Sequence, residues 1–429
     1  MGKIQIVLCV ILFMLPAPCF SVLPAYNPAI GQNQNDRDTL IIRYYHLGMD
    51  NVEILAYLSL IHGITLSYRH LKRILRQRGI RRRGQQSDEN AIAEALEMEL
   101  SGSGASIEYR QMHQRIRHNH KLLVSRKNIR LALRAMDPDG VDRRRRHRLQ
   151  RRLYRAKGPN FVWHLDGYDK LKYFGFCIHR AIDGYSRRIM WLEVDDSNKD
   201  PRSVARYFTE CVKQIGGVPR KIRGDAGTEN VNVAGVQRFL RRDGTDSFAG
   251  EKSFQYGQSV SNQRIECWWG FLRKTETDWW MNFFKNLREE GLFDDSDAAH
   301  VECLKFCFMN LLDQELKRVA QNWNLHKIRP SSSNLETPSG RPDTLFFLPA
   351  LSETSDYILP FTDEDMNVAE ELCCTERIPN ENRVAFAELA HMIMEDLALQ
   401  MPRNADEALA LYVDLLQSIH DLSGDQIPE

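Results

Sequence analysis

The sequence predicts an α/β core flanked by two all-helical regions. Between residues 162 and 230, short apolar runs that end on carboxylates predict the strands of a sheet. Apolar residues at helical spacing between residues 38 and 135 predict an all-α region, and two amphipathic, acidic segments near the end predict a helical tail. With 429 residues, the chain is long enough for two or three domains and a sizeable core.

The predicted core is arranged around one strand. The apolar run from 162 to 168 carries a single carboxylate, Asp166, at its exposed end. Paired strands are expected at 172–179 and 188–194, joined by a turn that begins at Asp183. Asp183 is a rival candidate for catalysis, but it lies where a turn residue belongs, so we assign it a structural role.

Helices and strands alternate through the rest of the core. Residues 201–215 and 231–240 are predicted helices, and a strand at 221–223 leads into Asp225. An extended segment at 254–257 then approaches a helix whose first turn contains Glu266. Three acids are thereby delivered from three different elements, which is typical of a metal site.

Asp166, Asp225 and Glu266 suit a hard divalent cation. Mg²⁺ binds a few carboxylates together with substrate phosphate oxygens. Two such ions about 3.5 to 4 Å apart activate the attacking oxygen and stabilise the leaving oxygen in phosphodiester chemistry. Glu229 is the closest competitor of Glu266, but it follows Asp225 so closely in the sequence that we expect it to shape the loop or to contact DNA.

Several motifs together carry a family resemblance. They are Trp163-His164-Leu165-Asp166, Ala181-Ile182-Asp183-Gly184-Tyr185-Ser186-Arg187, Gly224-Asp225 with Thr228-Glu229-Asn230, Asn262-Gln263-Arg264-Ile265-Glu266, and Trp323-Asn324-Leu325-His326-Lys327-Ile328-Arg329-Pro330. They resemble the retroviral integrase and DDE transposase superfamily, and in particular animal proteins with an integrase core domain derived from mobile elements. The similarity covers about residues 155–350. The interval between the last two acids is longer than in retroviral integrases, and a loop insertion at 241–252 would account for it.

The resemblance implies an RNase H-like integrase core and DNA integration, meaning metal-dependent DNA strand cleavage and strand transfer. It implies that Asp166, Asp225 and Glu266 hold Mg²⁺ or Mn²⁺, with water attacking in the cutting step and a DNA 3′-hydroxyl attacking in the joining step. Members of the superfamily generally act as homo-oligomers on paired DNA ends. The alternative is a domesticated, non-enzymatic DNA-binding protein that has kept the integrase fold.

Residues 36–84 resemble a helix-turn-helix module. Helices are expected at 38–47, 52–61 and 68–78, with Ser67 as the cap of the third. A recognition helix of this kind lies in the major groove of DNA. The third helix supplies the candidate DNA-binding residues Arg69, His70, Lys72, Arg73 and Arg76. The alternative is an exposed basic helix in an ordinary three-helix bundle.

Residues 88–150 resemble a second helix-turn-helix module followed by a basic linker. Helices are expected at 91–100, 107–117 and 126–135, with Ser125 as a cap. The candidate DNA contacts are Arg126 and Lys127 on the last helix and Arg143, Arg144, Arg145 and Arg146 in the linker. Arg273 and Lys274, beyond Glu266, are expected to hold phosphate beside the metal ions.

Charge is distributed unevenly along the chain. Residues 1–155 contain 27 Lys and Arg against 13 Asp and Glu, whereas residues 345–429 contain 3 against 18. The basic half predicts a polyanionic partner. The acidic helical region 351–429, with helices expected at 381–400 and 404–419, could bind a protein partner, shield the basic modules, or be a solvated appendage.

Cysteine usage favours a reduced compartment. Nine scattered cysteines do not make a disulfide framework. His300, Cys303 and Cys307 would share one face of a helix, as in a soft-metal site, but their neighbours are apolar. We therefore favour a buried core helix over zinc.

Residues 1–25 resemble a secretory signal peptide or a wrongly joined leader. A basic residue precedes an apolar run and then small residues, and the run is too short for a confident membrane span. Because the rest of the chain is directed at DNA, we expect a nuclear location and no membrane association.

Overall fold

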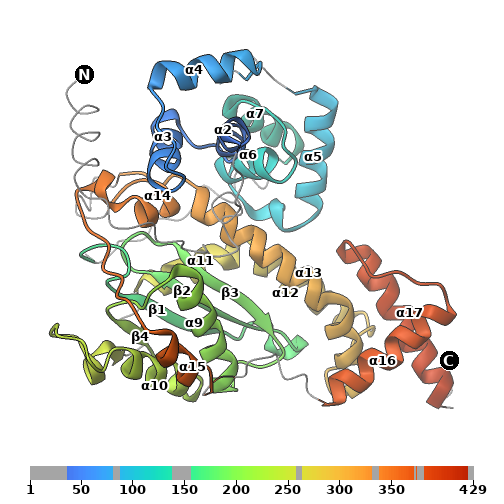
Figure 1. Cartoon of the computed structure of the whole chain (residues 1–429). Coiled ribbons are helices and arrows are strands. Elements are labelled where there is room, and N and C mark those ends of the chain that lie inside the picture. Colours follow the sequence, from blue (N-terminus) through green and yellow to red (C-terminus); the bar gives the residue numbers. More distant parts are fainter. Residues whose placement is uncertain are drawn as a thin grey trace.

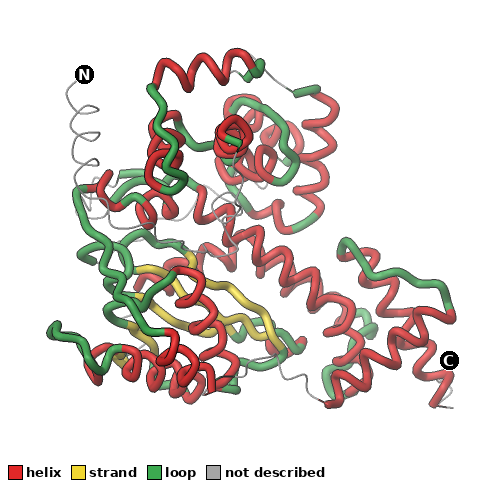
Figure 2. Tube along the Cα trace, in the orientation of Figure 1, coloured by secondary structure: helices red, strands yellow, loops and turns green. Residues whose placement is uncertain are grey.

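The computed structural model describes residues 36–80, 87–137, 156–257, 263–330, 338–371, 373 and 381–423. The signal-peptide-like leader and the Arg143 to Arg146 run lie outside these residues. A five-stranded sheet with helices around it forms the middle of the chain (Figures 1 and 2). The α/β core and the all-helical region before it were both predicted from the sequence, and both are confirmed.

The sheet is mixed and has the strand order β3-β2-β1-β4-β5. Its first three strands are antiparallel, and β4 and β5 continue it parallel to β1. The strands are β1 (Trp163–Tyr168), β2 (Cys177–Asp183), β3 (Ile189–Asp195), β4 (Ile222–Gly224) and β5 (Phe254–Tyr256). The central position of β1 places Asp166 between two neighbouring strands.

Helices cover both faces of the sheet, as consecutive residues of β2 demonstrate. The ring of His179 lies near Tyr207 of α9 (Pro201–Ile215), whereas Arg180 lies over the rings of Trp268 and Trp269 in α11 (Gln263–Leu272). Side chains alternate between the faces of a strand, so α9 and α11 lie on opposite faces. Burial on both faces explains why β2 is buried along its whole length.

The predicted strand at 172–179 was wrong at its start. Lys172–Phe174 form a 3₁₀ turn, and β2 begins only at Cys177. Gly175 ends the turn with φ +84°, in the left-handed region that favours glycine. Asp183 has the predicted structural role, because its carboxylate accepts hydrogen bonds from the backbone of Asn160, Tyr185 and Ser186.

A long helix, α13 (Ala298–Leu325), runs beside β3 and contacts both flanking regions (Figure 1). Asn324 is fully buried near its end, where Oδ1 accepts from the Ile189 backbone N–H at 2.8 Å and Nδ2 donates to the Ile189 carbonyl at 3.1 Å. This side chain pairs with β3 much as another strand would. The motif from Trp323 to Pro330 therefore joins the end of α13 to the sheet.

The N-terminal region consists of six helices in two groups of three. They are α2 (Arg37–His46), α3 (Asn51–Leu60), α4 (Tyr68–Gln77), α5 (Glu89–Ser101), α6 (Tyr109–His118) and α7 (Arg126–Met136). Ser67 and Ser125 cap α4 and α7 as predicted, each accepting a backbone N–H one turn into the helix. Each group has its own apolar core, and that of the first also includes Leu325 and Leu348.

The second group is joined to the core through buried charge. Arg115 on α6 forms ion pairs with Glu99 at 2.8 Å and with Glu276. Glu276 belongs to the π-helical turn η6 (Arg273–Thr277), which links α11 to α12 (Asp278–Glu289). The Arg115 guanidinium and the His120 ring hold the pKa of Glu99 at about 2, against the effect of burial.

The C-terminal region is also built into the core. After α14 (Pro342–Phe347) it contains α15 (Asp363–Glu371), α16 (Glu381–Asp396) and α17 (Ala405–Ser423). The sequence predicted the last two but not α15. Apolar residues of all three helices belong to the main hydrophobic cluster, among them Met366, Ala390, Tyr412 and Leu415. The possibility of a solvated appendage was therefore wrong for these helices.

Two further expectations concern buried and membrane-spanning helices. Cys303 and Cys307 are fully buried in α13, as predicted for a core helix. In the part of the chain that the structure describes, no helix has the length and apolar character needed to cross a membrane.

Candidate active site

The first two candidate acids emerge side by side from the sheet. Asp166 is in β1, and Asp225 directly follows β4. These strands are parallel neighbours, with His164 opposite Arg223. Continuing that register by two residues brings the two acids level, on strands about 4.8 Å apart. The structure thus brings together two acids that are distant in the sequence.

Asp166 is held by an indole of α11. Trp269 Nε1–H donates to Asp166 Oδ2 at 2.7 Å. Burial, reinforced by the charge of Asp225, raises the pKa of Asp166 to about 6, although the Trp269 bond and the Arg180 charge lower it. The ionised carboxylate is therefore costly here in the absence of a cation.

Asp225 is fixed by the loop that follows it. Its Oδ1 accepts from Asn230 Nδ2 at 2.8 Å and from the Gly227 N–H at 3.3 Å. A side chain at Gly227 would overlap the carboxylate of Glu229 in its present position, so Glu229 would have to move away. Asn230 is fully buried, so the conformation of this loop determines where the Asp225 carboxylate lies.

Glu229 lies closer to the site than the sequence suggested. Its carboxyl accepts from Asn230 Nδ2 at 3.3 Å. Burial raises its pKa, and the nearby charges of Asp225 and Asp169 add to the effect. Glu229 does shape the loop, as expected, but it also adds a carboxyl group beside Asp225.

Position 266 lies within α11, whose first turn the sequence predicted to contain Glu266. The side chain of Glu266 is outside the described residues. The helix places position 266 three residues before Trp269, so both positions share one face of α11. Because Trp269 contacts Asp166 from that face, backbone position 266 lies on the side of α11 nearest Asp166.

Residues 153–352 match the family model described as integrase core domain. This match places residues 153–352 in the DDE integrase/transposase superfamily. A search of curated proteins found no match. The integrase core has the RNase H-like fold, as the resemblance implied.

Arg180 orients the helix that carries Glu266 in the integrase core. It is fully buried in β2, opposite Asp166 in the register. Its guanidinium lies 4.1 Å from the ring centroid of Trp268 and 4.3 Å from that of Trp269, and it donates to the Ile265 carbonyl at 3.0 Å. Cation–π contacts and a charge-assisted hydrogen bond therefore hold α11 against the sheet.

Sequence reasoning missed Trp269, Asn230 and Arg180 as site residues. Trp268 is fully buried in the core, whereas Trp269 is half-buried and donates to Asp166. One signal was available: Trp269 is one helical turn beyond Glu266, so it had to share the face that meets the sheet. Nothing in the sequence indicated that Arg180 would point towards α11.

The expectation for Arg273 and Lys274 assumed that the α-helix continued. The chain instead forms the π-helical turn η6 from Arg273 onwards. Arg273 donates to Asp278 at 2.9 Å, and Lys274 is exposed. Arg273 is still near the site, because its charge acts on Tyr168, whose ring stacks on Trp269. Phosphate contact by these two residues stays a prediction.

The proposed DNA-binding helices have the amphipathic character that was predicted. On α4, Leu71, Ile74 and Leu75 are buried. The basic residues on its outer side are Arg69, Lys72, Arg73 and Arg76, which are exposed, and His70, which is half-buried. Arg126 and Lys127 are exposed at the start of α7. Figure 1 shows α4 on the side of the N-terminal region farthest from the sheet.

The acids fit a divalent metal by their chemistry. Asp166 and Asp225 offer hard oxygen ligands from adjacent strands, and the charge of one raises the pKa of the other. A divalent cation would remove that cost by neutralising both carboxylates. With Glu266 on the facing helix, the donors are the oxygen-only set that Mg²⁺ or Mn²⁺ prefers.

Proposed function

We propose that this protein is a DDE-type integrase or transposase that cleaves DNA and transfers the cut strand. The observation that carries the proposal is the convergence of Asp166 and Asp225 at neighbouring parallel strands, with α11 presenting position 266 beside them. Three carboxylates in this arrangement suit phosphodiester chemistry better than any other use of the site.

The chain's residues prepare the site before the substrate arrives. Trp269 fixes one oxygen of Asp166, and Asn230 fixes one oxygen of Asp225. Mg²⁺ or Mn²⁺ bound there would activate the attacking oxygen, from water or a DNA 3′-hydroxyl, and stabilise the leaving oxygen. Preorganised ligands lower the cost of positioning these groups.

We propose that the N-terminal helices hold the DNA. The exposed basic side of α4 and the start of α7 match the charge of a phosphate backbone, and α4 has the position in its module of a recognition helix. Activity as a homo-oligomer on paired DNA ends, a nuclear location, and a protein partner for the C-terminal region belong to the same proposal.

The test uses the full chain on supercoiled plasmid DNA with Mn²⁺ or Mg²⁺. We expect metal-dependent nicking that Asp225→Asn and Glu266→Gln each abolish. Glu229→Gln is the matched control, because it neutralises a carboxyl beside Asp225 that is not assigned to the metal. Loss of nicking in Glu229→Gln but not in Glu266→Gln would move the third ligand to Glu229.

The same assay separates the enzyme from the domesticated DNA-binding protein. The exposed basic helices support DNA binding in either case. Binding that persists in every variant, with no nicking by any of them on plasmid or on DNA carrying the element's own ends, would support the non-enzymatic alternative.

A further inference from the structure

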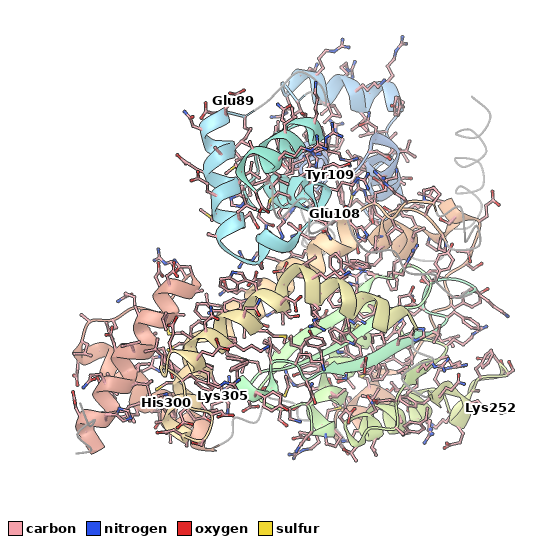
Figure 3. All side chains as sticks on the ribbon, turned by 180° about the vertical axis from the view of Figure 1, so that it is seen from behind. Glu89, Glu108, Tyr109, Lys252, His300 and Lys305 are labelled. Atoms are coloured by element: carbon pink, nitrogen blue, oxygen red, sulfur yellow. The ribbon has the colours of Figure 1, made fainter. Side chains whose placement is uncertain are left out.

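Two helices that are distant in the sequence bring a group of metal-ligating side chains together outside the acid site. Asp297 and His300 are at the beginning of α13, and His420 is near the end of α17. One ligand atom from each lies within 4.8 Å of the other two, and all three residues are half-buried. Figure 3 labels His300 where the beginning of α13 meets the C-terminal helices.

The tautomer of His300 is set by Tyr412. The Tyr412 hydroxyl has one hydrogen, which it donates to the Leu292 carbonyl at 2.8 Å. It must therefore accept the 2.8 Å bond from His300 Nδ1–H. The Asp294 N–H also points at Nδ1, from 3.4 Å, but a nitrogen that carries the hydrogen cannot accept from it, so we assign the tautomer from the two shorter bonds of Tyr412.

A neutral His300 with hydrogen on Nδ1 has its lone pair on Nε2. Metal-bound histidines usually have this arrangement, in which the second ring nitrogen donates to a fixed acceptor that orients the ring. Tyr412 is itself fully buried, so its position is well determined. Its hydroxyl therefore acts on His300 as an outer-shell partner acts on a metal ligand.

The other two ligands are also positioned. Asp297 caps α13, and its Oδ1 accepts from the Ala299 N–H at 2.7 Å, which fixes the carboxylate and leaves Oδ2 to bind a cation. The ring centroid of His420 lies 6.1 Å from that of His300. Two imidazole nitrogens and one carboxylate oxygen form a donor set that suits Zn²⁺.

We propose that Asp297, His300 and His420 bind one Zn²⁺ ion, with water as the fourth ligand. For three atoms that lie within 4.8 Å of one another, some point is no more than about 2.8 Å from each. Each ligand atom therefore needs to move by at most about 0.8 Å to reach the usual zinc distances of about 2.0 to 2.1 Å. The ion would link α17 to the start of α13 and so fix the C-terminal region to the core.

Cys303, one turn further along α13, is not part of this site. It is fully buried, and burial raises the pKa of its thiol to about 12, so it stays protonated. The sequence predicted that His300, Cys303 and Cys307 do not form a zinc site, and the burial of the two cysteines agrees with that prediction. The ligands proposed here instead join His300 to a residue 120 positions away in the sequence.

The test is titration of the full chain with Zn²⁺ by calorimetry and with Co²⁺ by visible absorption. The acid site can bind these ions too, so the decisive quantity is the stoichiometry lost in each variant. His420→Gln removes one ligand near the end of the last helix. Asp297→Asn removes the anionic ligand but keeps a residue that caps helices well, so the fold is preserved. His391→Gln, at an exposed position of α16, is the control.

We expect wild type and His391→Gln to bind one equivalent more than His420→Gln and Asp297→Asn, or to bind that equivalent at least tenfold more tightly. The Co²⁺ bands of a four-coordinate site should disappear with the same two variants. Equal stoichiometry and affinity in all four proteins would overturn the proposal and leave the three side chains as ordinary polar contacts between two helices. Far-ultraviolet circular dichroism verifies that each variant is folded.

Discussion

Trp269 donates its indole N–H to Asp166 at 2.7 Å, so the helix that carries Glu266 is attached directly to the first carboxylate of the site. The ring also stacks on Tyr168, two residues further along β1, at 4.8 Å between centroids. Helix α11 is thereby registered against β1 without any metal. Together with Arg180, this side chain fixes backbone position 266 relative to Asp166.

Trp269→Phe should reduce metal-dependent nicking by about 10- to 100-fold, the usual effect of losing a partner that orients a metal ligand. The phenyl ring keeps the stacking on Tyr168 but cannot donate the hydrogen bond. The measurement is the nicking rate as a function of Mn²⁺ concentration. Trp279→Phe on α12 is the control, since Trp279 is stacked on Phe283. An unchanged Mn²⁺ dependence in Trp269→Phe would refute the role assigned to the indole.

Asp166→Asn should stabilise the metal-free protein while abolishing its activity. The pKa of Asp166 is raised from 3.8 to about 6, so the folded state binds a proton more tightly than the unfolded state. The contribution of Asp166 therefore lowers the free energy of unfolding as pH rises from about 4 to 6, and this destabilisation is complete above pH 6. In EDTA at pH 7.5 the variant should be more stable by roughly 2 to 3 kcal/mol.

Urea denaturation at several pH values measures this difference. The difference in the free energy of unfolding between Asp166→Asn and wild type should shrink towards zero below about pH 4, where Asp166 is protonated in both the folded and the unfolded protein. Asp169→Asn, at an exposed neighbouring acid, is the control for the substitution itself. A variant less stable than wild type at pH 7.5 in EDTA would contradict the burial argument.

Acid should destabilise the core through His179. This residue is fully buried, Nδ1 accepts from Trp191 Nε1–H at 3.0 Å, and burial lowers its pKa to about 3. Below pH 6.5 this histidine becomes protonated in the unfolded chain but stays neutral in the folded protein. Its contribution to the free energy of unfolding therefore falls as pH decreases from 6.5 to about 3. The cost from this one residue is on the order of 3 to 5 kcal/mol.

Comparison with His179→Gln isolates this contribution. Gln can still accept from Trp191 but does not titrate, so the stability advantage of wild type at pH 7.5 should narrow as pH falls. His391→Gln, at an exposed position, is the control for the substitution itself. If the gap between wild type and His179→Gln stays constant from pH 7.5 to 4, His179 is not the group responsible.

Arg115→Met should loosen the contact between the second N-terminal group and the core. It leaves Glu276, which is 2% exposed, and Glu99 without their shared cation. Removing one partner of a buried ion pair costs about 3 to 5 kcal/mol. Urea denaturation should report this loss, with partial recovery in Arg115→Met/Glu276→Gln. Arg110→Met, exposed on the same helix, should change stability by less than about 0.5 kcal/mol.

Replacing Lys72 or Arg73 by Ala should weaken DNA binding in a salt-dependent way. Each phosphate contact contributes about 0.9 to the slope of log K against log salt concentration, so each variant should lower the slope by about that amount. Arg78→Ala is the control, because Arg78 is already paired with Asp38 at 3.1 Å. An unchanged slope in both α4 variants would remove this helix from the DNA interface.

The elements of the core could be predicted because strong local signals agreed with tertiary packing. The predicted helices at 201–215 and 231–240 match α9 and α10 residue for residue. The strand start at 172 failed because Lys172 to Phe174 turn before Gly175, a conformation that alternating polarity does not reveal. Helix α15 was not predicted because its sequence is mostly acidic and only two of its residues, Met366 and Ala369, are buried.

The site was predictable only in its acids. Both acids follow apolar runs that the sequence pattern reveals, although Asp166 lies within β1, which continues to Tyr168, and only Asp225 comes directly after a strand. The partners that fix them, Trp269 and Asn230, depend on packing between distant segments. The π-helical turn at Arg273 also has no local signature, so the prediction that extended the α-helix past Leu272 could not anticipate it.

Through helix α13, the part of the chain that packs together extends beyond the residues that match the family model. The matched core ends at residue 352, yet α13 packs against α17, and its last turn contributes Leu325 to the apolar cluster of the first N-terminal group. A protein cut to the matched residues would expose apolar surface at both ends of a helix about 42 Å long. The matched segment would therefore be poorly soluble alone, because the regions on either side of it help to keep it folded.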